Sequence, residues 1–303
     1  MRGGANSNSI WALPLGLLAL AAAIFALDLG GAATRLSGLE YDVYQQQHPR
    51  PYADPIGRGH YHVRTFAFDE KAIEKYGRWP WASDTLTRAT EALKKAGAPV
   101  IVYAFALDAS DPASPQRFAA QLPPDPANDA AREALNTMMS ADEALGESLA
   151  GVKAITGFTL RNDAGDDSVV SKAKIAADGA SDPLFYVQTY RYASRALPLL
   201  ETASAGSGAL NLAPDRDGVL RSLPLVYRLN GKPVPSLDAE TLRSALAPMA
   251  VHGAQGTIPG IDANPRIANI TFGGFVVPTR REEAMTIWFA RDPAARALNA
   301  SSV

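Results

Sequence analysis

Cysteine is absent from the 303 residues of this chain, which excludes disulfide bonds, thiol catalysis, iron–sulfur clusters and cysteine-ligated zinc. An excess of positive charge is also missing: 29 basic side chains are balanced by 31 acidic ones, whereas nucleic-acid binders usually carry a strong basic excess. The motifs of P-loop enzymes, dinucleotide-binding domains, nucleophile-elbow hydrolases and zinc proteases do not occur. We therefore expect no catalytic residue, no metal site, no cofactor and no nucleic-acid partner.

Histidines are few, with four in the whole chain. His60 and His62 fall two apart on one face of a predicted strand, which could be half of a zinc site. Because spacing identifies no third ligand, we interpret them as strand histidines, and His48 and His252 as loop residues. Serine, histidine and aspartate all occur, but nothing in their spacing orders them into a catalytic triad.

One long apolar run extends from Ile10 to Leu27. As a helix its 18 residues would rise about 27 Å, close to a hydrocarbon core of about 30 Å. A cleaved signal peptide is the alternative, but the run is long for one and no clear A-x-A site follows. We predict a cytoplasmic N-terminus over 1–9, a transmembrane anchor over 10–30 and an extracytoplasmic domain over 31–303, with Arg2 setting the orientation.

The next part of the chain alternates strands and helices. Asp69 is a predicted N-cap of a short helix ending at Gly77, and Ser83 of a longer helix ending at Gly97. Strands are predicted over 60–68, 99–107 and 152–160, and one helix over 127–149 with Met138 on its apolar side. The run over 99–107 is apolar throughout, which is typical of a strand buried on both faces. Strand, helix, buried strand is the pattern of a parallel pair.

Short strands and turns dominate the second half, with strands predicted over 208–212, 219–229, 267–272 and 285–290. Asn230-Gly231 is a strong turn signal, and Ser236 opens a helix to about residue 246. The polar stretch over 161–183 is interpreted as a tolerated insertion rather than a binding loop. The predicted fold class is α/β, a mixed β-sheet flanked by helices in a three-layer, sandwich-like arrangement, preceded by one N-terminal transmembrane helix.

Two short motifs stand out. In Gly-Arg-Trp-Pro-Trp, residues 77–81, two tryptophans around a proline form an apolar wedge; we interpret it as structural, with a ligand cavity or dimer contact as alternatives. In Pro-Asp-Arg-Asp-Gly, residues 214–218, the acidic pattern is similar to the start of a calcium loop, but Arg221 and Ser222 stand where later ligands belong. We interpret it as a turn in which Arg221 pairs with Asp215 or Asp217.

Taken in order, these blocks resemble the CHASE2 extracellular sensory domain of bacterial transmembrane receptors. The first block runs from Asp69 through the tryptophan motif to Ile101, the second covers 210–221, and the third is 235–237; the Tyr41-Asp42 pair is also similar. The resemblance extends from about residue 36 to the end of the chain. Where relatives usually carry aspartate, Ala67 and Ala104 stand here, so a polar pocket built on those carboxylates would be incomplete.

The resemblance implies a sensor without catalytic activity, periplasmic or extracellular, at the cell inner membrane and attached through Ile10–Leu27. It also implies a homodimer, a small-molecule or protein ligand, and regulation of a cytoplasmic class III adenylate or guanylate cyclase, before which we expect the chain to be truncated. Alternative outputs are a diguanylate cyclase, a histidine kinase or a Ser/Thr kinase; an anchored exported binding protein or hydrolase is an alternative of another class. The candidate ligand-binding or signature residues are Asp69, Arg78, Trp79, Trp81, Asn211, Asp215, Asp217 and Arg221.

Overall fold

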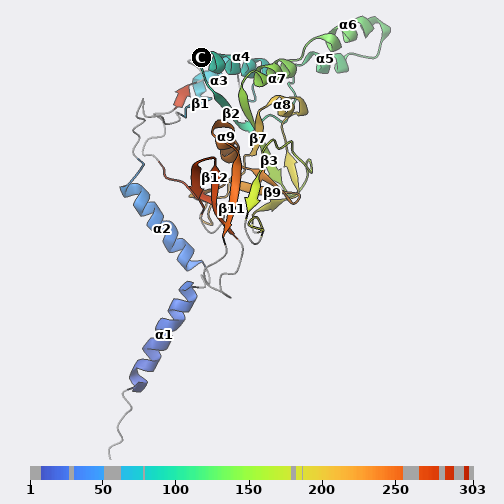
Figure 1. The fold of residues 1–303 in the computed structure, drawn as a ribbon. Helices are drawn as coiled ribbons and strands as arrows, with labels where there is room; N and C mark the ends of the chain where they lie inside the picture. Colours follow the sequence, from blue (N-terminus) through green and yellow to red (C-terminus); the bar gives the residue numbers. More distant parts are fainter. Residues whose placement is uncertain are drawn as a thin grey trace, which may run out of the picture. The chain divides into compact units, whose positions relative to one another are not determined.

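The computed structural model describes residues 8–26, 31–50, 63–77, 79–178, 182–185, 187–254, 266–279, 284–289 and 297–299. The chain divides into two compact units, one formed by residues 1–63 with 288–296 and the other by 64–287 with 297–303. Figure 1 gives the positions of the helices and strands within each unit. The predicted boundary at residue 30 between an anchor and a sensor domain stays a prediction.

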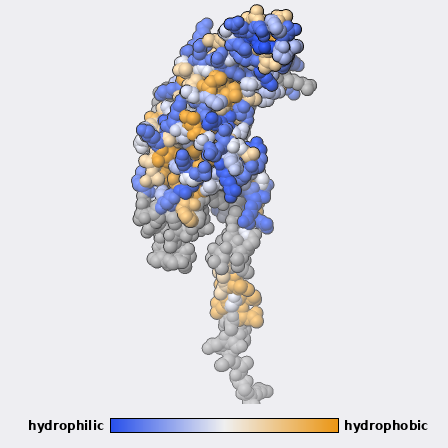
Figure 2. All heavy atoms as spheres, turned by 90° about the vertical axis from the view of Figure 1, so that its right-hand side faces the viewer, coloured by the Kyte–Doolittle hydropathy of each residue, from blue (hydrophilic) through white to orange (hydrophobic). Residues whose placement is uncertain are grey.

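The first unit contains two helices, α1 (Asn8–Ala26) and α2 (Ala32–Gln47). Between Leu13 and Leu20, five leucines of α1 are 57–72% exposed, and the segment is coloured hydrophobic in Figure 2. The helical conformation predicted for the apolar run is confirmed. The predicted membrane-spanning role is not supported, because no helix in the described part of the chain is both long and apolar enough to cross a membrane.

The central sheet of the second unit is built around β3 (Lys153–Arg161). Two strands pair with β3 in parallel, β2 (Val100–Ala106) and β7 (Gly206–Ala209), and β6 (Tyr192–Ser194) pairs antiparallel with its end. The prediction that β2 is buried on both faces is wrong: Ile101 and Tyr103 are buried, whereas Val102 between them is 37% exposed. Along this strand one face packs on the core and the other meets solvent.

The remaining strands form four further sheets among the described residues. They are β1 (Thr65–Ala67) with β15 (Ala297–Asn299); β10 (Lys232–Pro235), β9 (Val226–Leu229) and β5 (Thr189–Tyr190); β13 (Phe275–Pro278), β12 (Arg266–Phe272), β11 (Met249–Ala254) and β4 (Ala176–Asp178); and β14 (Ala284–Thr286) with β8 (Ser222–Pro224). The α/β class with mixed pairing is confirmed, but the strands are divided among small sheets in place of one sheet in a three-layer sandwich. The predicted parallel pair of the first two strands is also wrong, because β1 pairs with β15 and β2 with β3.

Seven helices of the second unit are described: α3 (Glu70–Tyr76), α4 (Ser83–Lys95), α5 (Pro115–Gln121), α6 (Pro126–Thr137), α7 (Ala141–Ala150), α8 (Pro198–Ala203) and α9 (Leu237–Ala245). Asp69 caps α3 as predicted, accepting a hydrogen bond from the Ala72 N–H at 2.9 Å. Ser83 does not cap α4: Ala82 is the N-cap and Ser83 is the first helical residue.

The single helix predicted over 127–149 is two helices, α6 and α7. The break lies at Ser140, whose hydroxyl accepts from the Glu143 N–H while the Glu143 carboxylate accepts from the Ser140 N–H. This capping box satisfies N–H groups at the start of α7, so a new helix begins there. Met138 lies outside both helices and is 54% exposed, not on an apolar face as predicted.

Helix α7 packs against α4, α8 and β3 of the central sheet, and its Leu145 and Leu149 are fully buried in that cluster. A second cluster of buried side chains, around Phe158 and Tyr227, joins β3 to β9 and β10. The strand β3 therefore contributes to two cores, and its end is held in a fixed position relative to both.

Candidate functional site

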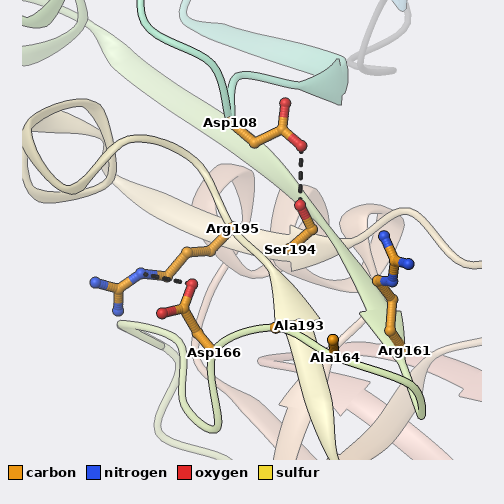
Figure 3. Close-up of a pocket in the computed structure, with 8 residues that line it drawn as sticks. Asp108, Arg161, Ala164, Asp166, Ala193, Ser194 and Arg195 are labelled. Atoms are coloured by element: carbon orange, nitrogen blue, oxygen red, sulfur yellow. Dashed lines mark hydrogen bonds and ion pairs between the residues drawn. The ribbon is translucent and has the colours of Figure 1, made fainter.

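A cavity of about 470 Å³ opens where β2, β3 and β6 end. Its lining residues are Asp108, Arg161, Ala164, Gly165, Asp166, Ala193, Ser194 and Arg195 (Figure 3). Asp108 comes just after β2 and Arg161 is the last residue of β3. Because β2 and β3 are parallel, these two side chains belong to the carboxyl-end edge of the sheet, the place where open α/β sheets bind ligands.

The polar side chains of the cavity are fixed by contacts within the chain. Ser194 Oγ donates a hydrogen bond to Asp108 Oδ2 at 2.8 Å, and the two side chains point toward each other in Figure 3. Arg195 Nε lies 3.5 Å from Asp166 Oδ2. The two terminal Nη atoms of Arg195 have no partner among the described residues, so these donors are available to a bound molecule.

A buried carboxylate supports Arg195. Glu201 of α8 is 1% exposed, and its Oε2 lies 3.6 Å from Arg195 Nε with no hydrogen-bond partner in the described structure. Its Oε1 accepts from the Val170 N–H at 2.9 Å. A buried carboxylate is costly without an opposite charge, so Glu201 and Arg195 hold each other at the cavity wall.

The other guanidinium, of Arg161, is bound to Asp163 through two hydrogen bonds of 2.9 and 2.6 Å. Those bonds keep the pKa of Asp163 well below its usual range and raise that of Arg161. Both side chains are about half exposed or more, so the pair sets the direction of the guanidinium more than it stabilises the fold.

Backbone contacts fix the loop that closes the cavity. Asp166 and Ala193 exchange two N–H to carbonyl hydrogen bonds, of 2.9 and 2.7 Å. Gly165 has φ +146°, and a Cβ there would lie 2.5 Å from the Ala193 carbonyl oxygen. Only glycine fits this approach, so the stretch that the sequence indicated to be a tolerated insertion supplies part of the cavity wall.

The turn at residues 215–221 is formed as predicted. Arg221 donates to Asp215 Oδ2 at 2.7 Å and to both carboxylate oxygens of Asp217, at 3.0 and 2.8 Å. Gly218 has φ +81°. The hydrogen bonds from Arg221 lower the pKa of Asp217 to about 2. None of these residues lines the cavity.

The tryptophan motif contributes to an aromatic cluster. Trp81 is 8% exposed and its ring centroid lies 4.4 Å from that of Phe68 and 5.5 Å from that of Tyr76. Trp79 is 43% exposed, and its ring stacks on that of Phe68 with 5.3 Å between centroids. The predicted site residue Arg78 lies outside the described residues. Asp69 caps α3 and does not line the cavity.

Asn211 of the predicted set lies beside the cavity edge without lining it. Its Oδ1 accepts from the Leu160 N–H at 2.7 Å and its Nδ2 donates to the Leu160 carbonyl at 3.0 Å. Leu160 directly precedes Arg161, so Asn211 holds the end of β3 in place. The hydrogen-bonding groups of the Asn211 side chain are thus directed to the chain itself.

A carboxylate, an imidazole and a hydroxyl follow one another across three neighbouring strands. Asp178 Oδ2 lies 2.8 Å from His252 Nδ1, and His252 Nε2 lies 2.9 Å from Thr271 Oγ1. His252 therefore belongs to β11, not to a loop as predicted. Thr271 lies on β12, which is paired on both sides by β11 and β13, so the backbone donors around it serve the sheet and not an oxyanion hole. We interpret the row as a cross-strand link.

No candidate metal site is found among the described residues, because no group of three or more histidine, aspartate or glutamate side chains there could hold an ion. The predicted zinc pair, His60 and His62, lies outside the described residues.

Comparison with models of protein families tests the family resemblance that the motifs indicated. The family model for the CHASE2 domain matches residues 17–303. The chain belongs to the CHASE2 domain family. Comparisons with curated proteins and with solved structures found no match. CHASE2 is a sensory and not a catalytic domain, and the resemblance predicted from the sequence is confirmed.

Sequence reasoning missed the cavity of this CHASE2 domain. A signal was available, since polar residues directly after two predicted strands lie at one edge if the strands are parallel. Asp108 and Arg161 meet that condition. Ser194 ends β6, a short strand that the sequence did not indicate, and Arg195 directly follows it; no local pattern brings them to Asp108.

Proposed function

We propose that this CHASE2 domain is the extracytoplasmic sensor of a membrane signalling receptor, that its ligand binds in the cavity at the ends of β2 and β3, and that its output is a cytoplasmic class III adenylate or guanylate cyclase. The observation that carries the proposal is the family match over residues 17–303 together with a polar cavity at the ligand-binding edge of a parallel pair. Ligand binding would shift the population between two arrangements of the domain.

The lining of the cavity supports a small polar ligand with both hydrogen-bond donors and acceptors. Two guanidinium groups and two carboxylates line it, with a serine hydroxyl between them. Arg195 offers its Nη donors to an acidic group, and Asp108 offers carboxylate oxygen to an amine or a hydroxyl. Free amino acids and small hydroxy acids have this combination.

The residues that carry the family resemblance have a structural role in this proposal. Trp81 fills a core, Asn211 fixes the end of β3, and Arg221 closes a turn. Each is engaged within the chain. We therefore place ligand recognition on the cavity residues and not on these signature residues.

Membrane attachment is proposed through Ile10–Leu27. The exposed leucines of α1 form an apolar surface that is unfavourable in water and stabilised by lipid or by protein. A fusion of alkaline phosphatase after residue 303 tests the location of the domain, because that enzyme is active only after export. Activity supports a domain outside the cytoplasm, and an inactive fusion with an active cytoplasmic reporter at the same site would contradict it.

The ligand test uses the full chain and a panel of free amino acids and small hydroxy acids. We expect one of these two classes of compound to raise the melting temperature of the chain, because a ligand that binds only the native state stabilises it. Arg195→Lys, which keeps the charge beside Glu201 and removes the Nη donors, should lose that shift. The matched control Arg88→Lys, on the exposed surface of α4, should keep it. A panel without effect, or a shift unchanged in Arg195→Lys, would contradict the assignment of the cavity.

The output is tested separately. The complete reading frame containing this chain is expressed in bacteria that lack their own adenylate cyclase, and cyclic AMP and cyclic GMP are measured with and without the ligand found above. We expect a ligand-dependent change that Arg195→Lys abolishes. A reading frame with no cyclase module would contradict the cyclase output and leave the sensor proposal in place.

A further inference from the structure

A stripe of apolar side chains lies on α2, in the first unit of the chain. Leu36, Leu39 and Val43 are 55%, 60% and 51% exposed, and they follow one another at steps of three and four residues. This is the spacing of the a and d positions of a coiled coil, which places all three on one side of a helix.

Other side chains of α2 have contacts within the chain. The ring of Tyr44 stacks on that of His48 with 4.9 Å between centroids. Gln45 Oε1 accepts from the Phe289 N–H at 3.0 Å. These contacts occupy the C-terminal end of α2 and leave the stripe exposed within the unit that contains it.

Charge on either side of the stripe selects the partner. Arg35 directly precedes Leu36 and Glu40 directly follows Leu39, which makes them the g and e positions of the same heptad pattern. In a parallel pair of helices a g residue faces the e residue five positions later on the other helix, so Arg35 of each copy would face Glu40 of the other. In an antiparallel pair Arg35 would instead face Asp42, the other g residue, but Asp42 is half-buried and already has a contact within the chain, whereas Glu40 is exposed. The stripe is therefore complementary to itself in parallel orientation.

We propose that α2 is the interface between two copies of this chain, packed in parallel through Leu36, Leu39 and Val43 with reciprocal Arg35–Glu40 ion pairs. The helix has 16 residues, about two heptads, and a contact of that length is weak between free chains. It becomes effective when a common membrane raises the local concentration of the two copies. Parallel packing is also what two copies inserted with the same orientation would adopt.

The absence of cysteine gives a direct test, because each single-cysteine variant of the full chain has one reactive thiol. Cysteine is placed at Leu36, Leu39 or Val43, and at Ser37 and Tyr44 as controls on another side of the helix. Membranes from expressing cells are treated with a short bis-maleimide and dimers are quantified on denaturing gels. We expect at least fivefold more dimer at the three stripe positions than at the controls. Equal crosslinking at all five positions, or none at the stripe, would overturn the proposal.

Charge exchange then tests the parallel register. In the Leu39→Cys background, Arg35→Glu and Glu40→Arg should each reduce dimer yield several-fold, and the two changes together should restore it. If the double exchange does not restore the dimer yield, the proposed reciprocal pairing of Arg35 with Glu40 is wrong. If a lipid or another protein covers the stripe, the stripe positions are protected from the bis-maleimide and yield no dimer. The proposal rests on the membrane attachment proposed above, but crosslinking requires neither ligand nor output, so its failure is distinguishable from a failure of ligand sensing or of the cyclase output.

Discussion

Replacement of Arg221 by alanine removes the cation that closes the turn between β7 and β8. The Arg221 side chain is 10% exposed and donates to Asp215, which is 30% exposed, and to Asp217, which is 54% exposed. Its backbone carbonyl also accepts from the Ile287 N–H at 3.0 Å, where β8 meets β14. The substitution therefore leaves two acidic side chains without their cation and a gap beside a strand pair.

The Asp215 contact is expected to dominate the loss. A hydrogen bond between charged groups contributes about 1.5–3 kcal/mol to stability when the groups are partly withdrawn from water, whereas an exposed pair such as Arg221–Asp217 contributes little. We expect Arg221→Ala to lower the free energy of unfolding by about 2–3 kcal/mol. For a domain of this size that corresponds to a fall in melting temperature of roughly 5–10 °C.

The assay is thermal unfolding of the full chain at neutral pH, followed by circular dichroism. Arg216→Ala is the matched control, since Arg216 is an exposed arginine in the same turn. Arg221→Lys should recover part of the loss, because lysine keeps the charge and lacks the planar fork. If Arg221→Ala lowers the melting temperature no more than Arg216→Ala does, the structural role assigned to Arg221 is refuted.

Three further changes test other parts of the fold. Asp217→Asn should lower the melting temperature slightly at pH 7 and not near pH 2: the pKa of Asp217 falls from 3.8 to about 2 in the folded chain, so its contribution, small because the carboxylate is exposed, is present above pH 4 and lost as the pH falls through 2; a pH series of melting curves measures this. Trp81→Ala should cost about 3–5 kcal/mol in urea unfolding, and the exposed Trp79→Ala clearly less. Gly208→Ala should reduce the yield of folded protein, because the new Cβ would lie 2.5 Å from Leu237 Cα, a backbone atom that cannot move aside.

Local signals in the sequence predicted local structure. Asp69 caps its helix, and Asn230 and Gly231 adopt the positive φ values, 49° and 78°, of a two-residue hairpin turn. The break between α6 and α7 also had a local signal, Ser140 followed three residues later by Glu143, which is the pattern of a capping box. In these cases the residues that decide the structure are within four positions of one another.

Pairing between distant strands could not be predicted in the same way. β1 pairs with β15 although more than 220 residues separate them. The sequence of a short apolar strand contains no feature that identifies the strand with which it pairs. The exposed face of β2 is a related case. Val102 is as apolar as its buried neighbours, so the sequence does not show that no helix or strand packs on that face of β2. The cavity depends on several such pairings at once, which is why it was missed.

The two sets of residues, those of the resemblance and those of the cavity, differ in where their hydrogen bonds go. Arg221 directs its guanidinium to two aspartates of its own turn, and Asn211 directs both side-chain groups to Leu160. Such residues cannot bind a ligand without releasing part of the fold. Arg195, in contrast, is held through Nε by Asp166 and Glu201, and its Nη donors make no hydrogen bond to the described residues. Under the proposed function, the signature residues stabilise the CHASE2 fold while the cavity residues would select the ligand, so domains with the same signature would differ in the ligand they recognise.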